Sequence, residues 1–264
     1  MTQPPLPKYH QVYLVLRQQI EEGRFSEGLP GEFALMHEFG VARVTVRRAL
    51  QQLQTEGMVS REPGRGTRAL SQRDPAPPRE RRAPHRGVGL HGLLENLVDM
   101  GMRTTVKVVD LGTVTASSVV AGALQLSLGE AVHKTVRVRS TRAGPVSYIT
   151  TWVPASVAPA FGRRELSRKP ILMLLEEAGI KLGCAHQTVS ARLAGAAVAE
   201  HLEVAVGAPL LSVQRVIFDK RDRPVQWLNG LYRPDRYSYE MHMSGVGSIE
   251  AKVWVSNDIS ADLH

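Results

Sequence analysis

The chain has 264 residues, of which 43% are hydrophobic and 22% are charged, a composition typical of a globular protein with room for two domains. It contains no apolar run of about 18 residues, which excludes a helical membrane span, and its first residues lack the pattern of a secretory signal. The single cysteine, Cys184, excludes an internal disulfide and fits a reducing cytoplasm. The net charge of +8 is densest at residues 71–86, where five arginines accompany two acidic residues.

The first 70 residues predict three helices followed by a hairpin. We expect helices over about residues 9–20, 32–39 and 43–56, because apolar residues recur there at helical spacing. Each of these stretches is followed by a glycine that is suited to end a helix. The breaker-rich turn Glu62–Gly66 lies between two β-like stretches and predicts the hairpin. The apolar stripe of the third helix comprises Val46, Ala49, Leu50 and Leu53.

The third helix leaves arginines outside its apolar stripe. Arg43 and Arg47 are four residues apart and therefore share a face, and Thr45 and Arg48 add to the polar surface. Such a helix suits the major groove of DNA, where arginine binds guanine or phosphate. Arg65 at the hairpin tip is placed to contact phosphate or the minor groove. The alternative is a surface helix of an ordinary helical domain, and the hairpin and the basic segment favour DNA binding over it.

A spaced series of residues carries a resemblance over positions 8–70. It comprises Leu29-Pro-Gly-Glu32, Phe39-Gly-Val41, Arg43-Val-Thr-Val-Arg-Arg-Ala-Leu50, Glu56-Gly57 and Gly64-Arg-Gly-Thr67. This series resembles the winged helix-turn-helix domain of the GntR family of bacterial regulators. The resemblance implies a cytoplasmic homodimer on a roughly palindromic double-stranded DNA operator. It also implies DNA contacts from Arg43, Thr45, Arg47 and Gly66.

Three positions depart from the family pattern. The family usually has serine where this chain has Gly31, a basic residue where it has Phe33, and serine or threonine where it has Ala42. Ala42 lacks the hydroxyl that caps the third helix, a loss of about 1 kcal/mol. Because the basic residue at the Phe33 position commonly contacts the operator, we expect an altered or relaxed half-site.

The rest of the chain predicts a linker and an α+β domain. Residues 71–86 hold four prolines and almost no large apolar side chain, which predicts an extended linker. The linker separates a predicted DNA-binding domain at 1–70 from a predicted effector-binding domain at 87–246, and residues 247–264 form a tail. Paired β-rich stretches indicate an antiparallel sheet. The predicted strands are 104–111, 132–140, 146–153, 210–218 and 225–232, and the predicted helices are 90–100, 116–124 and 171–178.

Several short motifs in this second part carry another resemblance. They are Arg137-Val-Arg139, Gly144-Pro145, Trp152-Val-Pro154, Asp222-Arg-Pro-Val225 and Tyr232-Arg-Pro-Asp-Arg-Tyr237. They resemble the UTRA effector domain of HutC-like GntR regulators, which shares its fold with chorismate lyase. Residues two apart in a strand point to the same side, so Arg137 and Arg139 share a face and are suited to bind a carboxylate or phosphate. A solvated outer face is the alternative, and the resemblance favours an effector site that also includes Gln226 and Tyr232.

The resemblance also bears on the kind of effector. This chain has Pro170, Ile149 and Gln226 where sugar-phosphate-binding members tend to have a serine and two glutamates. Losing these partners of sugar hydroxyls favours a small or apolar organic acid over an amino-sugar phosphate. We therefore expect a small anionic effector, either an organic acid or a phosphorylated metabolite.

The remaining motifs predict no cofactor, no metal site and no catalytic residue. Gly87–Gly92 fits GxGxxG but follows a proline-rich segment where a dinucleotide site needs a strand. Cys184 and His186 are too few ligands for a closed zinc site and are expected to be ordinary strand residues. The sequence therefore predicts a transcriptional regulator, most simply a repressor, and not an enzyme. The alternative is a chorismate-lyase-like enzyme with an accessory DNA-binding domain, although a shared fold does not imply shared chemistry.

Overall fold

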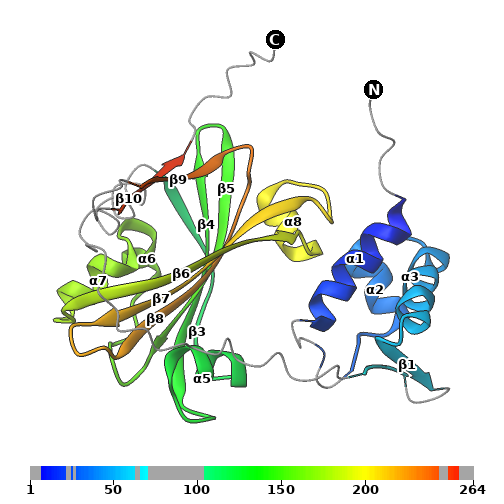
Figure 1. The fold of residues 1–264 in the computed structure, drawn as a ribbon, viewed down its shortest axis with the longest axis horizontal. Helices are drawn as coiled ribbons and strands as arrows, with labels where there is room; N and C mark the ends of the chain where they lie inside the picture. The colour runs from blue at the N-terminus through cyan, green and yellow to red at the C-terminus, as the bar shows by residue number, and fades with distance from the viewer. Residues whose placement is uncertain are drawn as a thin grey trace. The chain divides into compact units, whose positions relative to one another are not determined.

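A computed structural model of the chain is shown in Figure 1, and it describes residues 7–21, 25, 28–62, 66–70, 104–243 and 249–255. The chain divides into two compact units. The first comprises the described residues before position 84 together with Arg192–Pro209, and the second comprises the others. The predicted linker at 71–86, the helix predicted at 90–100 and Arg65 lie outside the described residues. Within the described part, no helix is long and apolar enough to span a membrane.

The first unit contains the predicted three helices and hairpin. The elements are α1 (Lys8–Glu21), α2 (Glu32–Phe39), α3 (Arg43–Thr55), β1 (Val59–Glu62) and β2 (Gly66–Ala69). The expected stripe of α3 is buried, and it packs with Leu16 of α1 and Leu35 of α2 in one hydrophobic core. Burial of each large aliphatic side chain contributes about 1.5–3 kcal/mol, so the core fixes which face of α3 remains outside.

The beginning and the end of α3 are held differently. Ala42 stands at the N-cap and makes no side-chain hydrogen bond, as the departure from the family pattern predicts. Close to the other end of α3, the hydroxyl of Tyr13 donates to the carboxylate of Glu56 at 2.7 Å and ties α1 to α3. The turn before α3 is closed by Gly40, which adopts the left-handed conformation that glycine tolerates best. Packing and this tie, more than capping, therefore position the outward residues of α3.

The second unit is built on a six-stranded sheet with the order β3-β4-β5-β8-β7-β6 (Figure 1). The ladders that join β3, β4, β5, β8 and β7 are antiparallel, which confirms the α+β class with an antiparallel sheet. The strands are β3 (Thr105–Thr115), β4 (Ala131–Thr141), β5 (Gly144–Pro154), β6 (Leu182–Leu193), β7 (Pro209–Asp219) and β8 (Pro224–Tyr232).

Helices pack on both faces of this sheet. On one face, α6 (Arg163–Arg168) and α7 (Ile171–Glu177) bury Leu166 and Leu175 against Val213 and other apolar residues of the sheet. On the opposite face, α5 (Ser118–Leu124) packs with Trp227. The rings of Trp152 and Trp227 stack there with centroids 4.5 Å apart. The alternation of the strands therefore assigns each residue to one of two different environments.

Some elements were not predicted from the sequence. Strand β6 carries Cys184 and His186, which confirms that they are strand residues. Helix α6 and helix α8 (Ala196–Leu202) were also missed, because they bury only Leu166 and only Ala199 and Leu202, respectively, too few residues for an apolar stripe at helical spacing to show. Part of the predicted tail at 247–264 forms β10 (Ile249–Val255), which pairs antiparallel with β9 (Tyr237–Met243).

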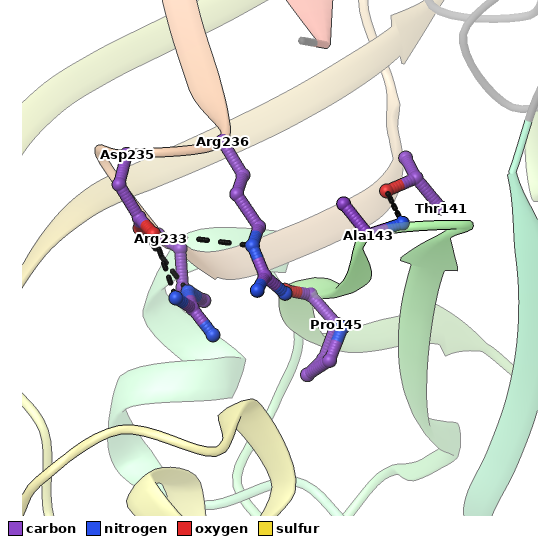
Figure 2. A network of polar contacts seen from close by, with 6 residues as sticks. All are labelled: Thr141, Ala143, Pro145, Arg233, Asp235 and Arg236. Atoms are coloured by element: carbon purple, nitrogen blue, oxygen red, sulfur yellow. Dashed lines mark hydrogen bonds and ion pairs between the residues drawn. The ribbon is translucent and has the colours of Figure 1, made fainter. Parts of the chain in front are cut away.

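Residues of two UTRA-like motifs meet at the turn between β4 and β5 (Figure 2). Arg236 reaches this turn and donates from Nη1 to the carbonyl oxygen of Pro145 at 3.0 Å. The neighbouring Arg233 pairs with Asp235 at 2.6 Å. Gly144 has φ +112°, and a Cβ built on it would lie 2.6 Å from Nη1 of Arg236. These motif residues therefore join two distant turns of the fold.

Gly144→Ala should destabilise the second unit. The alanine must adopt an unfavourable positive φ and displace Arg236, so we expect a loss of about 1–3 kcal/mol in the free energy of unfolding. Urea unfolding followed by tryptophan fluorescence measures it, because all three tryptophans lie in the second unit. The control is Gly122→Ala in α5, where a Cβ meets nothing within 4 Å and helix propensity predicts a gain of about 0.5–1 kcal/mol. Equal stability of Gly144→Ala and wild type would contradict this account.

Candidate functional site

The exposed face of α3 presents two arginines together. The side chains of Arg43 and Arg47 are 56% and 64% exposed, and both point toward the carboxylate of Glu32 at the start of α2. Arg43 Nε donates to Glu32 Oε2 at 2.8 Å, and Arg47 Nε lies 3.8 Å from Glu32 Oε1. One carboxylate thus holds two guanidinium groups near each other on a helix whose opposite face is anchored in the core.

Two apolar side chains lie beside these arginines. Phe33 is 72% exposed, and the guanidinium carbon of Arg43 lies 5.3 Å from the centre of its ring. Val44 in the first turn of α3 is also exposed. Apolar groups in this position are suited to contact the methyl group of thymine, whereas a basic residue at position 33 would contact phosphate or guanine. The departure at Phe33 therefore changes the chemistry of this surface.

The other predicted DNA-binding residues differ from one another in exposure and in the contacts that they make. Thr45 is half-buried in the first turn of α3, and Gly66 is exposed at the start of β2 with φ +79°. The guanidinium carbon of Arg48 lies 3.9 Å from the centre of the Tyr9 ring, so Arg48 contacts α1 and does not join Arg43 and Arg47 at Glu32. Arg65 lies outside the described residues.

The second unit contains a cavity, which we call the arginine cavity. Its volume is about 40 Å³. On this measure one water molecule needs roughly 10–15 Å³, so the cavity favours a compact ligand. Its lining comprises Arg137 and Arg139 of β4, Ile149 of β5, Arg215 of β7, Gln226, Leu228 and Tyr232 of β8, and Pro170, Ile171 and Leu172 around the start of α7.

Strand register explains why these residues meet. Arg137 pairs with Ile149, and Ile149 pairs with Gly230. Two residues before Gly230 in β8, and therefore on the same face, Leu228 pairs with Arg215 of β7. Paired residues in antiparallel strands point to the same side, so four neighbouring strands contribute side chains to one face. The prediction that Arg137 and Arg139 lie on the same face of one strand is therefore confirmed. That face is buried and not solvated.

All three arginines of the cavity are buried, and each has different polar surroundings. Nε and Nη1 of Arg137 make no hydrogen bond to any described residue. Arg139 donates from Nη1 to the hydroxyl of Thr104 at 3.0 Å. Arg215 donates from Nε to the side-chain oxygen of Gln187 at 2.7 Å, and its Nη2 contacts the same oxygen. The described lining contains no carboxylate.

The electrostatics of the cavity follow from this burial. Burial, followed by the nearby charge of Arg139, lowers the pKa of Arg137 to about 9, and Tyr232 partly opposes the shift. Burial also lowers the pKa of Arg139 and of Arg215. A pKa of about 9 leaves Arg137 charged at neutral pH. The cavity therefore concentrates positive charge in a place that water solvates poorly, which favours an anion.

Tyr232 occupies the middle of the cavity face. A Cβ built on Gly230 would lie 2.6 Å from Cε2 of Tyr232, so the glycine leaves the space that the ring fills. Burial raises the pKa of Tyr232, while the charges of Arg215, Arg139 and Arg137 lower it in part. The phenol therefore stays protonated at neutral pH beside all three arginines and is able to donate a hydrogen bond to an anion.

Sequence reasoning identified four residues of this cavity and missed one charged residue. Arg137, Arg139, Gln226 and Tyr232 all line the cavity, but the pocket also includes Arg215, which was not predicted. A signal for Arg215 was present. It shares a strand face with Leu211, Val213 and Ile217, so a charged residue interrupts an inward-facing apolar row at a period of two.

The family comparisons match two successive parts of the chain, and the second match also covers Arg192–Pro209, which the fold groups with the first unit. Residues 8–68 match the family of bacterial regulatory proteins named gntR, and residues 99–238 match the UTRA domain family. Among the described residues, Arg43 and Arg47 fall in the first match and the arginine cavity falls in the second.

Relatives and a solved structure agree with both matches. The chain is 26% identical over 243 residues to the HTH-type transcriptional repressor NagR of Bacillus subtilis, with 91% of this chain and 96% of that protein covered. It is 27% identical over 247 residues to the histidine utilization repressor of Pseudomonas putida, with 92% and 95% covered. The structure of PhnF from Mycobacterium smegmatis superposes with a TM-score of 0.50 at 27% identity, covering 89% of this chain and 99% of that chain.

Arg137→Met should stabilise the ligand-free protein. The change replaces a buried charge by an apolar side chain of similar length, so we expect a gain of about 1–4 kcal/mol in the free energy of unfolding. Urea unfolding followed by tryptophan fluorescence in a buffer without phosphate or carboxylates measures the change. Arg142→Met, at an exposed position in the turn between β4 and β5, removes the same charge and should have little effect. A less stable Arg137→Met protein would show instead that Arg137 is already paired.

Proposed function

The chain belongs to the GntR family of bacterial regulatory proteins with a UTRA domain, and we propose that it represses transcription until a small anion binds in the arginine cavity. It is a DNA-binding transcriptional regulator, and its relatives with named functions support this role over that of a lyase-like enzyme. We further propose that it acts in the cytoplasm as a homodimer on a roughly palindromic operator. Two equivalent helices then contact two half-sites.

The observation that carries the proposal is the placement of Arg43 and Arg47 together on the exposed face of α3. Glu32 keeps both guanidinium groups in position before DNA binds, which reduces the entropy lost when they contact base edges. In this proposal Thr45 and Gly66 contact the DNA backbone or neighbouring bases, and Arg65 extends the contacts from the hairpin. Arg48 contributes chiefly through the electrostatic attraction of phosphate, because its guanidinium lies over Tyr9.

Arg47→Ala should weaken operator binding and loosen base discrimination. An operator is first selected from random duplexes with the wild-type protein, and affinities are then measured by fluorescence anisotropy at several salt concentrations. We expect a loss of about 1–3 kcal/mol on the selected operator and a weaker salt dependence. Arg142→Ala removes a charge from the second unit and should bind like wild type. If Arg47→Ala binds as tightly as Arg142→Ala, the assignment of α3 as the DNA-contacting helix is wrong.

The effector part of the proposal rests on buried positive charge. A cavity with three guanidinium groups and no described carboxylate favours an anion, and burial excludes water from competing for it. We propose that Arg137 and Arg139 bind one carboxylate or phosphate, with Gln226 and Tyr232 as further hydrogen-bonding partners. An anion that binds one arrangement of the two units better than another then shifts the protein between states with different operator affinity.

Small anions should release the operator through Arg137. The wild-type complex with fluorescent operator is titrated with short organic acids and phosphates, and at least one class should dissociate it. Arg137→Met should bind the operator normally but respond only at concentrations about ten- to hundredfold higher, because a charge-assisted contact is lost. Arg142→Met serves as the control for net charge. Release of DNA from Arg137→Met and wild type at equal anion concentrations would place the effector elsewhere.

A further inference from the structure

The positive charges of the arginine cavity come from two opposite sides. Arg137 and Arg139 lie on β4, whereas Arg215 lies on β7, and the strands β5 and β8 separate them. Three strand spacings put the backbones of β4 and β7 roughly 14 Å apart. Because arginine side chains are long, guanidinium groups from both sides still reach one cavity.

The surface between these two sides is uncharged. Ile149 of β5 and Leu228 of β8 line the cavity there, and the phenol of Tyr232 interacts electrostatically with the arginines of both sides. The described lining offers no carboxylate to balance the buried guanidinium of Arg215. The partner of Arg215 is the neutral amide of Gln187, which orients the guanidinium but does not balance its charge.

We propose that the effector is a compact anion with two negative charges, one bound by Arg137 and Arg139 from β4 and the other bound by Arg215 from β7. This inference rests on the proposed effector function and adds the charge class of the ligand. It also makes Arg215 a specificity-determining residue of the cavity. Short dicarboxylates and phosphate-bearing small molecules share this chemistry.

A ligand with two charges is favoured because each buried guanidinium group needs a counter-charge. An anion with one charge bound at the β4 side leaves the guanidinium of Arg215 buried without a counter-charge, which is strongly unfavourable. A second charge on the ligand removes that penalty and adds charge-assisted hydrogen bonds. The small volume of the cavity limits the distance between the two charges, which favours compact ligands over long ones.

The test compares ligands that differ only in their second charge. The full-length protein is titrated by calorimetry with the dicarboxylates from oxalate to glutarate, with the monoamide of each one, and with inorganic phosphate. Each monoamide matches its dicarboxylate in shape but carries an amide in place of one carboxylate. The proteins are wild type, Arg215→Met, Arg137→Met and the exposed control Arg142→Met. Circular dichroism checks that each variant is folded.

We expect the best divalent ligand to bind wild type and Arg142→Met about ten- to hundredfold more tightly than its monovalent match. In Arg215→Met this preference should disappear, because the divalent ligand then binds as weakly as the monovalent one, while monovalent binding is kept. Preference for phosphate over the dicarboxylates, lost in the same variant, supports the proposal equally and identifies the source of the charge. If Arg215 has only a structural role, Arg215→Met should lower the affinities for the divalent and the monovalent ligand by the same factor.

Three outcomes overturn the two-charge proposal, and only the last of them also overturns the proposed effector function. If monovalent and divalent ligands bind wild type equally and both depend on Arg137, the effector function stands and the two-charge inference is wrong. If Arg215→Met weakens both classes equally, Arg215 has no role in selecting charge and the inference is also wrong. If no anion of either class binds, or binding is unchanged in Arg137→Met, the proposed effector site itself fails.

Discussion

Three buried guanidinium groups line one cavity, and the packing of the effector domain has to offset the free-energy cost of burying this positive charge. An unbalanced buried charge destabilises a fold, and the neighbouring guanidinium groups repel one another. The sheet tolerates the charge because apolar side chains of α6, α7 and the strands bury enough surface around it. Such an arrangement makes the stability of the domain sensitive to an anion, since a ligand that balances the charge binds the folded state alone.

The cavity also explains the departures from the wider effector family as one related set of changes. Pro170, Ile149 and Gln226 all line the cavity, so the positions singled out by resemblance do meet in space. At these three positions the lining offers neither a hydroxyl nor a carboxylate, and the same cavity is lined by Arg137, Arg139 and Arg215. The described lining is therefore better suited to bind negative charge than to accept hydrogen bonds from sugar hydroxyls.

In the DNA-binding unit, unlike in the arginine cavity, the charged groups are exposed, and the core only orients them. Packing of Val46, Leu50 and Leu53 fixes the rotation of α3, and Glu32 then holds Arg43 and Arg47 near each other. The missing cap at Ala42 has little effect on this arrangement, because tertiary contacts contribute more to a helix in a core than its cap does. Phe33 and Val44 beside the arginines give the surface an apolar character that a basic residue at position 33 would not.

The sequence by itself determined the local elements and the residues that the helices present. Helical spacing located α1, α2 and α3 and the face of α3 that carries Arg43 and Arg47, because a helix is specified by residues three or four apart. It also placed Arg137 and Arg139 on one face of a strand. Only the tertiary structure decided that this face is buried and that Arg215 belongs to it. Strand order joins residues almost eighty positions apart, and no local pattern encodes which strands become neighbours.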